Sequence, residues 1–122
     1  MKKILFIEDE ESLQNVVKET LKENGYNVLS ALDGKKGIEI AKNEKPDLIL
    51  LDLILPQKDG FEVLEALKEN PNTAVIPVIV LTNLEGSADI EKALSLGART
   101  YLVKSNYSLD DVLLKVKNVF GE

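Results

Sequence analysis

Four apolar runs in this sequence each end in polar side chains that could do chemistry. The first run ends in Glu8 and Asp9, and three later runs end in Asp52, Thr82 and Lys104. If these runs are neighbouring strands of a parallel sheet, their carboxyl ends lie along one edge, which is where ligands bind in open α/β sheets. The sequence therefore predicts a single crevice in which three carboxylates, a hydroxyl and an ammonium converge.

The types of these five side chains indicate phosphoryl transfer. Clustered carboxylates repel one another, and the chain contains no cysteine and no histidine, so the natural partner is a hard cation with oxygen ligands, Mg2+ or Mn2+. Lys104 and Thr82, on the far side of Asp52, could hold the oxygens of a phosphoryl group. A metal, a carboxylate nucleophile and charge-stabilising donors are what this reaction requires, since its catalysis is mainly positioning and electrostatics.

The composition restricts the other possibilities. A chain of 122 residues suits one domain with a real core, and we expect residues 1–122 to form it. The net charge of −6, from 15 basic and 21 acidic residues, argues against nucleic acid or an anionic membrane as a partner. No stretch has the pattern of a signal peptide or the length of a membrane span. We therefore expect a cytoplasmic protein without a disulfide framework.

Asp52 follows the most informative apolar run. Residues Leu48 to Leu51 are all aliphatic, the pattern of a central parallel strand that helices cover on both faces. The Pro-x-x-Asp-Gly turn from Pro56 to Gly60 must then lead the chain away from the sheet. An acid after a strand is most often a turn or helix-cap residue. However, a charge is costly in an apolar setting unless it is paired, bound to a metal or reachable by ligand, and four such strand ends coincide here.

The rest of the pattern predicts strands that alternate with helices. Apolar runs predict strands at residues 4–7, 28–31, 48–51, 78–81 and 101–103. Helical spacing predicts five helices, carried by Leu13, Val16, Val17, Thr20 and Leu21, by Ile38 and Ala41, by Phe61, Leu64 and Leu67, by Ile90, Ala93 and Leu94, and by Leu109, Val112, Leu113, Val116 and Phe120. We expect Ser87 to cap the fourth helix, and Ser108 with Asp111 to form a capping box on the last. Right-handed crossovers with helices on both faces then give an α/β fold with a doubly wound, five-stranded parallel sheet.

Taken together, these motifs resemble a bacterial two-component response-regulator receiver domain, similar to the single-domain regulators of chemotaxis and sporulation. The resemblance covers nearly the whole chain. It rests on the segments Phe6 to Asp9, Asp47 to Pro56 with Asp59-Gly60, Pro77 to Thr82, Leu96 to Ala98, and Tyr101 to Lys104. It implies a flavodoxin-like (βα)5 arrangement with the strand order 2-1-3-4-5.

The resemblance also implies a phosphorylation site. Asp52 would receive a phosphoryl group from a sensor histidine kinase or a phosphotransfer protein. Mg2+ would be held by Asp9, Asp52 and the backbone carbonyl of Ile54, with Glu8 acting through water. The domain would then be no enzyme in the ordinary sense, but a phosphoacceptor that assists its own phosphorylation and dephosphorylation.

A conformational switch is the other implication. Thr82 and Lys104 would contact the phosphoryl oxygens, and Thr82 with Tyr101 would form the switch. The output would be a changed affinity for a downstream protein or for a second copy of the chain, transmitted through the fourth helix, the fifth strand and the last helix.

Three positions depart from the family pattern. The family usually has a cis proline after the lysine, whereas Ser105 follows Lys104 here. A cis bond before a residue other than proline costs about 3–4 kcal/mol, which favours a trans peptide and a differently directed loop. Asn83 replaces the small residue that usually follows the threonine, and Glu8 replaces the more common aspartate.

Two other classes of protein remain open at this point. A haloacid dehalogenase-type phosphatase also combines a strand-end aspartate, a threonine or serine and a lysine with Mg2+. That class needs a second acid two residues after its nucleophile, where this chain has Ile54, and it needs room for a cap domain. A degenerate receiver that only binds partners would normally have lost an acid or the lysine, and all of them are present here.

Overall fold

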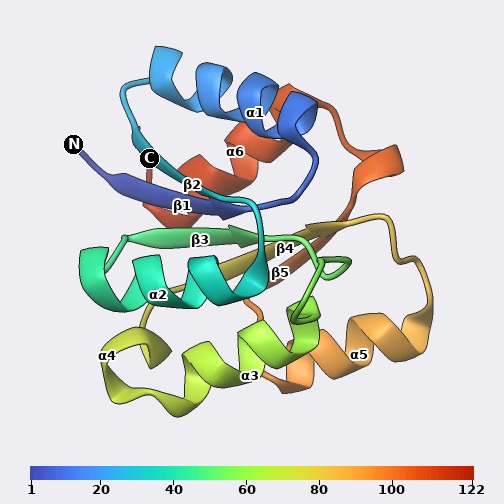
Figure 1. Ribbon diagram of the computed structural model, residues 1–122. Helices are drawn as coiled ribbons and strands as arrows, with labels where there is room; N and C mark the ends of the chain where they lie inside the picture. Colours follow the sequence, from blue (N-terminus) through green and yellow to red (C-terminus); the bar gives the residue numbers. More distant parts are fainter.

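The computed structural model describes all 122 residues and contains a five-stranded parallel sheet with helices on both faces (Figure 1). The strands are β1 (Lys3–Ile7), β2 (Asn27–Ala31), β3 (Leu48–Leu51), β4 (Val78–Thr82) and β5 (Thr100–Val103). Their order in the sheet is β2-β1-β3-β4-β5, and every neighbouring pair is parallel. The predicted doubly wound, flavodoxin-like α/β fold and its strand order are confirmed.

The helices form one layer on each side of the sheet. They are α1 (Glu11–Glu23), α2 (Gly34–Glu44), α3 (Gly60–Glu69), α4 (Pro71–Ala74), α5 (Ser87–Ser95) and α6 (Leu109–Val119), with a 3-10 turn, η1 (Lys104–Asn106), after β5. Figure 1 shows α1 and α6 on one face of the sheet and α2, α3 and α5 on the other. None of these helices is both long and apolar enough to cross a lipid bilayer.

The central strand is buried on both faces, as its aliphatic sequence predicted. Ile49 and Leu51 belong to the core beneath α2, α3 and α5, while Leu48 and Leu50 belong to the core beneath α1 and α6. All four side chains are fully buried, and burial of such a side chain stabilises a protein by about 1.5–3 kcal/mol. Asp52 therefore follows a strand whose side chains are all fully buried.

Some details of the predicted helices were wrong. The one-turn helix α4 was not predicted; it forms because the Asn70 side chain accepts a hydrogen bond from Asn72 N at 2.9 Å and proline occupies its first position. Ser87 is the first residue of α5 and not its cap, because the extended N-cap position is taken by Gly86. The Ser108–Asp111 capping box of α6 is confirmed.

The apolar stripe of α1 also differs from the prediction in one respect. Val16 was expected to face the core, but its side chain is 46% exposed, and Leu94 in α5 is exposed to the same extent. The buried residues of α1 are Gln14, Val17 and Leu21. A polar side chain therefore occupies a core-facing position of this helix.

Gly60, the first residue of α3, is expected to be essential for the turn that follows Asp52. A Cβ atom at this position would lie 2.6 Å from the Asp52 carbonyl oxygen and 2.9 Å from the Leu53 carbonyl carbon, and backbone atoms cannot move away as a flexible side chain would. Gly60→Ala should therefore lower the free energy of unfolding by about 2–3 kcal/mol in a urea titration. The exposed Gly86, the N-cap of α5, provides the control, because Gly86→Ser should change it by less than about 0.5 kcal/mol. Equal stability of the two variants would contradict the close approach.

Candidate functional site

The five strand-end residues that were predicted to converge do so. Glu8 and Asp9 follow β1, Asp52 follows the neighbouring β3, Thr82 ends β4, and Lys104 follows β5. Since the strands are parallel and adjacent in the order β1-β3-β4-β5, these positions share one edge of the sheet.

The centre of this site is a cluster of three carboxylates. One oxygen from each of Glu8, Asp9 and Asp52 lies within 4.8 Å of the others; Glu8 and Asp52 are buried, and Asp9 is exposed. The Lys104 ammonium lies 2.6 Å from Glu8 Oε1 and 3.1 Å from Asp52 Oδ2. Three carboxylates thus share a single neighbouring ammonium, that of Lys104.

The pKa values of the buried pair reflect this crowding. Burial raises the pKa of Glu8 to about 7, and the negative charge of Asp52 adds to the effect, although the hydrogen bond from Lys104 opposes it. Burial lowers the pKa of the Lys104 ammonium, but the hydrogen bond to Glu8 and the charge of Asp52 outweigh burial and raise it above its usual value. The lysine therefore stays charged, and Glu8 holds its proton more tightly than an exposed glutamate would.

The metal-free protein should consequently lose stability as the pH rises. Because the folded state binds the Glu8 proton more tightly than the unfolded chain does, folding is favoured by acid at this residue, and that contribution is lost between about pH 4.5 and the folded pKa of about 7. The expected loss is about 2–3 kcal/mol. Urea titrations across this pH range, with chelator present, give the free energy of unfolding as a function of pH. In Glu8→Gln, this free energy should no longer fall between about pH 4.5 and 7. A slope that is unchanged in Glu8→Gln would contradict the raised pKa.

The turn after β3 fixes the Asp52 side chain. Asp52 N donates to Ile7 O at 3.0 Å, and Ile54 N donates to Asp52 Oδ1 at 3.2 Å. Gly60 N donates to Leu53 O at 2.9 Å and closes the turn. The carboxylate is thus held at the edge, with its second oxygen directed to Lys104. The carbonyl of Ile54 as a metal ligand stays a prediction.

Thr82 and Tyr101 lie on the β4 and β5 side of the site. The Thr82 hydroxyl is buried and has no hydrogen-bond partner within the protein. The Tyr101 ring packs partly buried against the core, and its hydroxyl donates to Leu84 O at 2.9 Å, on the loop after β4. The loop that follows Thr82 is therefore in direct contact with the aromatic residue of β5.

The loop after Lys104 differs from the usual family geometry, as its sequence indicated. The structure has no cis peptide bond, so the Lys104–Ser105 peptide is trans, and the chain forms the 3-10 turn η1. Ser105 Oγ donates to Glu85 Oε1 at 3.1 Å and joins this loop to the one after β4. The side chain of Lys104 nevertheless reaches Glu8 and Asp52. Asn83 is exposed on the loop that Ser105 contacts.

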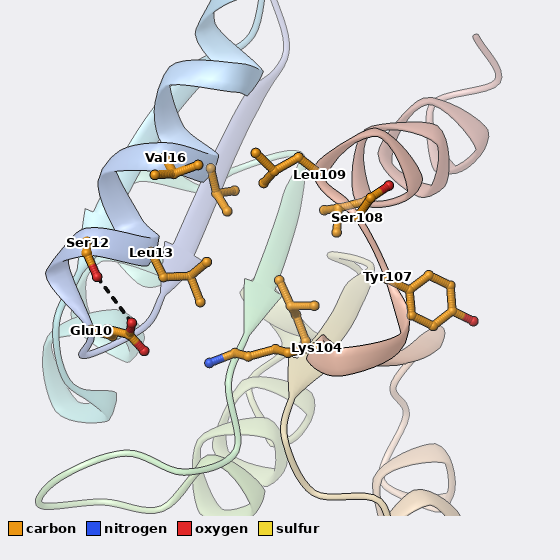
Figure 2. A pocket seen from close by; sticks show the side chains of 11 residues that line it. Glu10, Ser12, Leu13, Val16, Lys104, Tyr107, Ser108 and Leu109 are labelled. Atoms are coloured by element: carbon orange, nitrogen blue, oxygen red, sulfur yellow. Dashed lines mark hydrogen bonds between the residues drawn. The ribbon is translucent and has the colours of Figure 1, made fainter.

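An apolar groove of about 370 Å3 adjoins the site between α1 and α6 (Figure 2). Leu13 and Val16 of α1 face Leu109 of α6 across it, and Lys104 extends into the space below them (Figure 2). The exposed Val16 is thus part of the wall of this groove.

Gln14 is a residue near the site that the sequence analysis missed. Its side-chain nitrogen donates to the carbonyls of Phe6, Glu8 and Ala31, at the ends of β1 and β2. The signal was present in the sequence, since Gln14 stands three and seven residues before Val17 and Leu21 on the same helical face.

The comparisons with known proteins agree with this geometry. The family model of the response regulator receiver domain matches residues 4–117. The chain is 38% identical over 118 residues to the alkaline phosphatase synthesis transcriptional regulatory protein PhoP of Bacillus subtilis, and 39% identical over 117 residues to the DNA-binding dual master transcriptional regulator RpaA of Synechocystis. These matches cover 97% and 96% of this chain but only 48% of either relative, so the chain spans about half of their length.

Solved structures give the same result over the whole chain. The chemotaxis protein CheY4 of Vibrio cholerae superposes with a TM-score of 0.90 at 28% identity, covering 98% of each chain. The receiver domain of the sensor histidine kinase PA1611 of Pseudomonas aeruginosa, solved with a magnesium ion in its active-site cleft, gives a TM-score of 0.89 at 28% identity and covers 99% of this chain and 98% of that one. The chain belongs to the response regulator receiver domain family of two-component signalling.

Proposed function

We propose that this chain is a phosphoacceptor whose Asp52 receives a phosphoryl group from a histidine kinase or phosphotransfer protein. The observation that carries the proposal is the Asp52 carboxylate, which is buried beside two other acids and only 3.1 Å from the Lys104 ammonium. An Asp52 oxygen would form a bond to phosphorus while the bond from phosphorus to the donor's imidazole nitrogen breaks, and the bonding electrons would stay on that nitrogen. Residues 1–122 would then be the receiver unit.

A divalent cation fits the residues that are present. Three carboxylate oxygens within 4.8 Å of one another, opposed by one lysine, make a hard-oxygen donor set with excess negative charge. Asp9, Asp52 and the Ile54 carbonyl would hold Mg2+ or Mn2+, with Glu8 acting through water. When bound, the metal would supply positive charge that offsets the repulsion between the acids and the incoming phosphoryl group.

Lys104 and Thr82 would bind the phosphoryl oxygens. The Lys104 ammonium is already in contact with Asp52, so it can follow the negative charge as that charge moves onto the phosphoryl group. The buried Thr82 hydroxyl has a free donor for the same group. Because all five residues are present at the same edge of the sheet, the structure supports an active receiver over a degenerate one. Membership of the receiver family leaves no support for the phosphatase alternative.

Incubation with acetyl phosphate and Mg2+, followed by intact-mass measurement, tests the acceptor role. The protein should gain one phosphoryl group, and chelator should prevent the gain. Asp52→Asn is the matched variant, because it keeps the shape of the side chain and removes the nucleophilic charge. A gain of mass by Asp52→Asn, or one that chelator leaves unaffected, would contradict the assignment.

The output surface would consist of α5, β5 and α6. Phosphorylation places negative charge and strong acceptors beside Thr82, whose hydroxyl should move toward them. This movement vacates space beneath β5, and the Tyr101 side chain should move to fill it. The partner would be a downstream protein or a second copy of the chain. Its contacts would fall on Tyr101 and on four exposed residues in or just after α5: Glu91, Lys92, Ser95 and Arg99. The net charge of −6 and the family support a cytoplasmic location, and we expect no direct contact with nucleic acid or membrane.

The phosphoryl group on Asp52 should have a long lifetime. Ile54 and Leu84, two residues beyond Asp52 and Thr82, would flank it, and neither aliphatic side chain can orient an attacking water. Ile54 is the better position to change, since it is 52% exposed, whereas Leu84 packs partly against the core. Ile54→Asn should accelerate loss of the phosphoryl group about tenfold, less than the roughly 10²–10⁴-fold of a well-placed general base. The decay of the phosphorylated mass after removal of the donor measures this, with Ile54→Val as control, and an unchanged rate in Ile54→Asn would refute the explanation.

A further inference from the structure

The side-chain amide nitrogen of Gln14 donates hydrogen bonds to backbone carbonyls at the ends of β1 and β2. The residue is 3% exposed, and its Nε2 donates to Phe6 O at 2.8 Å, Glu8 O at 3.1 Å and Ala31 O at 3.0 Å. Two N–H bonds serve three carbonyls, so at least one of them is shared. The three carbonyls also fix the orientation of the amide, because the opposite orientation would place its oxygen against three acceptors.

The other end of the same amide shows that this arrangement has a cost. Gln14 Oε1 is buried and has no hydrogen-bond partner within the protein. A buried acceptor without a partner costs about 1–3 kcal/mol. A glutamine in the apolar stripe with Val17 and Leu21 is therefore not explained by packing alone. What it adds is a pair of donors at the point where β1 ends.

Glu8 and Asp9 follow directly after β1, at the same end of the strand. Glu8 N still bonds to Ala31 O at 3.0 Å, but β2 ends at Ala31, so no strand residue is left to bond the Glu8 carbonyl. Gln14 takes that carbonyl, and Glu8 is thus held at both its N–H and its C=O. The next residue is Asp9, and the Glu8 carboxylate also accepts a hydrogen bond from Glu10 N at 3.1 Å.

We propose that Gln14 is a positioning residue for the acid site: by bonding the Glu8 carbonyl, it fixes the peptide from which the Glu8 and Asp9 carboxylates project toward Asp52. This inference rests on the proposed function, since it assigns Gln14 to the cation-binding side of that site. Gln14 would contact neither the metal nor the phosphoryl group, because its side chain bonds only to backbone carbonyls. It acts as outer partners of metal ligands generally do, where loss of such a partner lowers metal affinity by about 10–100-fold.

Calorimetric titration with magnesium chloride tests the inference on the unphosphorylated protein. Gln14→Met keeps the length and volume of the side chain and removes both donors, so the Mg2+ affinity should fall by about tenfold or more. Gln14→Asn withdraws the amide by one methylene and should lower the affinity as well; it decides the question if Gln14→Met does not fold. Amide NMR signals of Glu8 and Asp9 should broaden or shift in either variant before any metal is added.

Thr73→Val is the matched control for a general loss of stability. Thr73 is equally buried, and its hydroxyl donates to Leu67 O at 2.6 Å on α3, outside the acid site. This variant should be less stable than the parent and bind Mg2+ with the parent's affinity. An unchanged Mg2+ affinity in a folded Gln14 variant, or an equal fall in Thr73→Val, would overturn the inference. If the unmodified protein bound no Mg2+, the proposed function would itself be contradicted, and the role of Gln14 with it.

Discussion

Replacing Lys104 with methionine is expected to destabilise the metal-free protein by about 2–4 kcal/mol. The Lys104 ammonium is the cation bonded to Glu8 and Asp52, and both carboxylates are buried. Removal of one partner from a buried ion pair costs about 3–5 kcal/mol, because the remaining charge is left without compensation. The loss is reduced here because Glu8, whose pKa is already about 7, can take up a proton. Urea titration near neutral pH measures the effect.

The same substitution should reduce phosphoryl uptake by about 10²–10³-fold, the usual effect of removing one donor that stabilises developing charge. The initial rate of mass gain with acetyl phosphate and Mg2+ measures this. Lys36→Met is the control, since Lys36 is exposed and its 3.9 Å contact with Glu39 is also exposed; such pairs contribute about 0–1 kcal/mol. A Lys104→Met protein as stable and as reactive as Lys36→Met would contradict the arrangement described for the site.

Thr82→Ala should separate phosphoryl binding from the response to it. The Thr82 hydroxyl has no hydrogen-bond partner within the protein, so the substitution breaks no internal hydrogen bond and should cost at most about 1–2 kcal/mol for the lost methyl group and its packing. Asp52, the acids and Lys104 are unchanged, so the protein should still bind beryllofluoride, which mimics the phosphoryl group. Without the hydroxyl, however, nothing on β4 should pull the loop that holds Leu84 and, through it, Tyr101.

NMR spectra with and without beryllofluoride, in the presence of Mg2+, measure this separation. In the parent protein, shifts should extend from the strand-end loops to Tyr101 and α6; in Thr82→Ala they should stop at the loops. Thr82→Ser keeps the hydroxyl and should restore the full pattern. Shifts in the parent that remain confined to the loops around Asp9, Asp52 and Lys104 would mean that Tyr101 is fixed and the surface indifferent to phosphorylation.

The site could be predicted from sequence because its residues follow uninterrupted apolar runs. Leu48 to Leu51 has no polar position, which is the pattern of a strand buried on both faces and predicts Asp52 at its end. The order of the strands, by contrast, could not be predicted from the apolar runs. Alternating strands and helices are compatible with several orders, and only the resemblance supplied 2-1-3-4-5, which places β1 beside β3 and so brings Asp9 to Asp52.

The errors have local physical causes. In α1, helical spacing allowed either Val16 or Gln14 to face the core, and hydrophobicity favoured valine; the donors of Gln14 and the carbonyls at the end of β1 decided otherwise. Likewise, Asn70 is the C-cap of α3, and the Asn70-Pro71 pair also caps and begins the short α4, which was not predicted. Both are effects of hydrogen bonds to the backbone, to which hydrophobic periodicity is insensitive.

Chemical identification of the modified residue tests most directly whether Asp52 is the phosphoacceptor. After incubation with acetyl phosphate and Mg2+, borohydride reduces an acyl phosphate to the corresponding alcohol, and peptide mass spectrometry locates the reduced side chain. The assignment of Asp52 as the phosphoacceptor predicts that Asp52 alone is reduced, and that no residue is reduced when chelator is present. Reduction at another carboxylate, or at Asp52 to the same extent without a divalent cation, would contradict it.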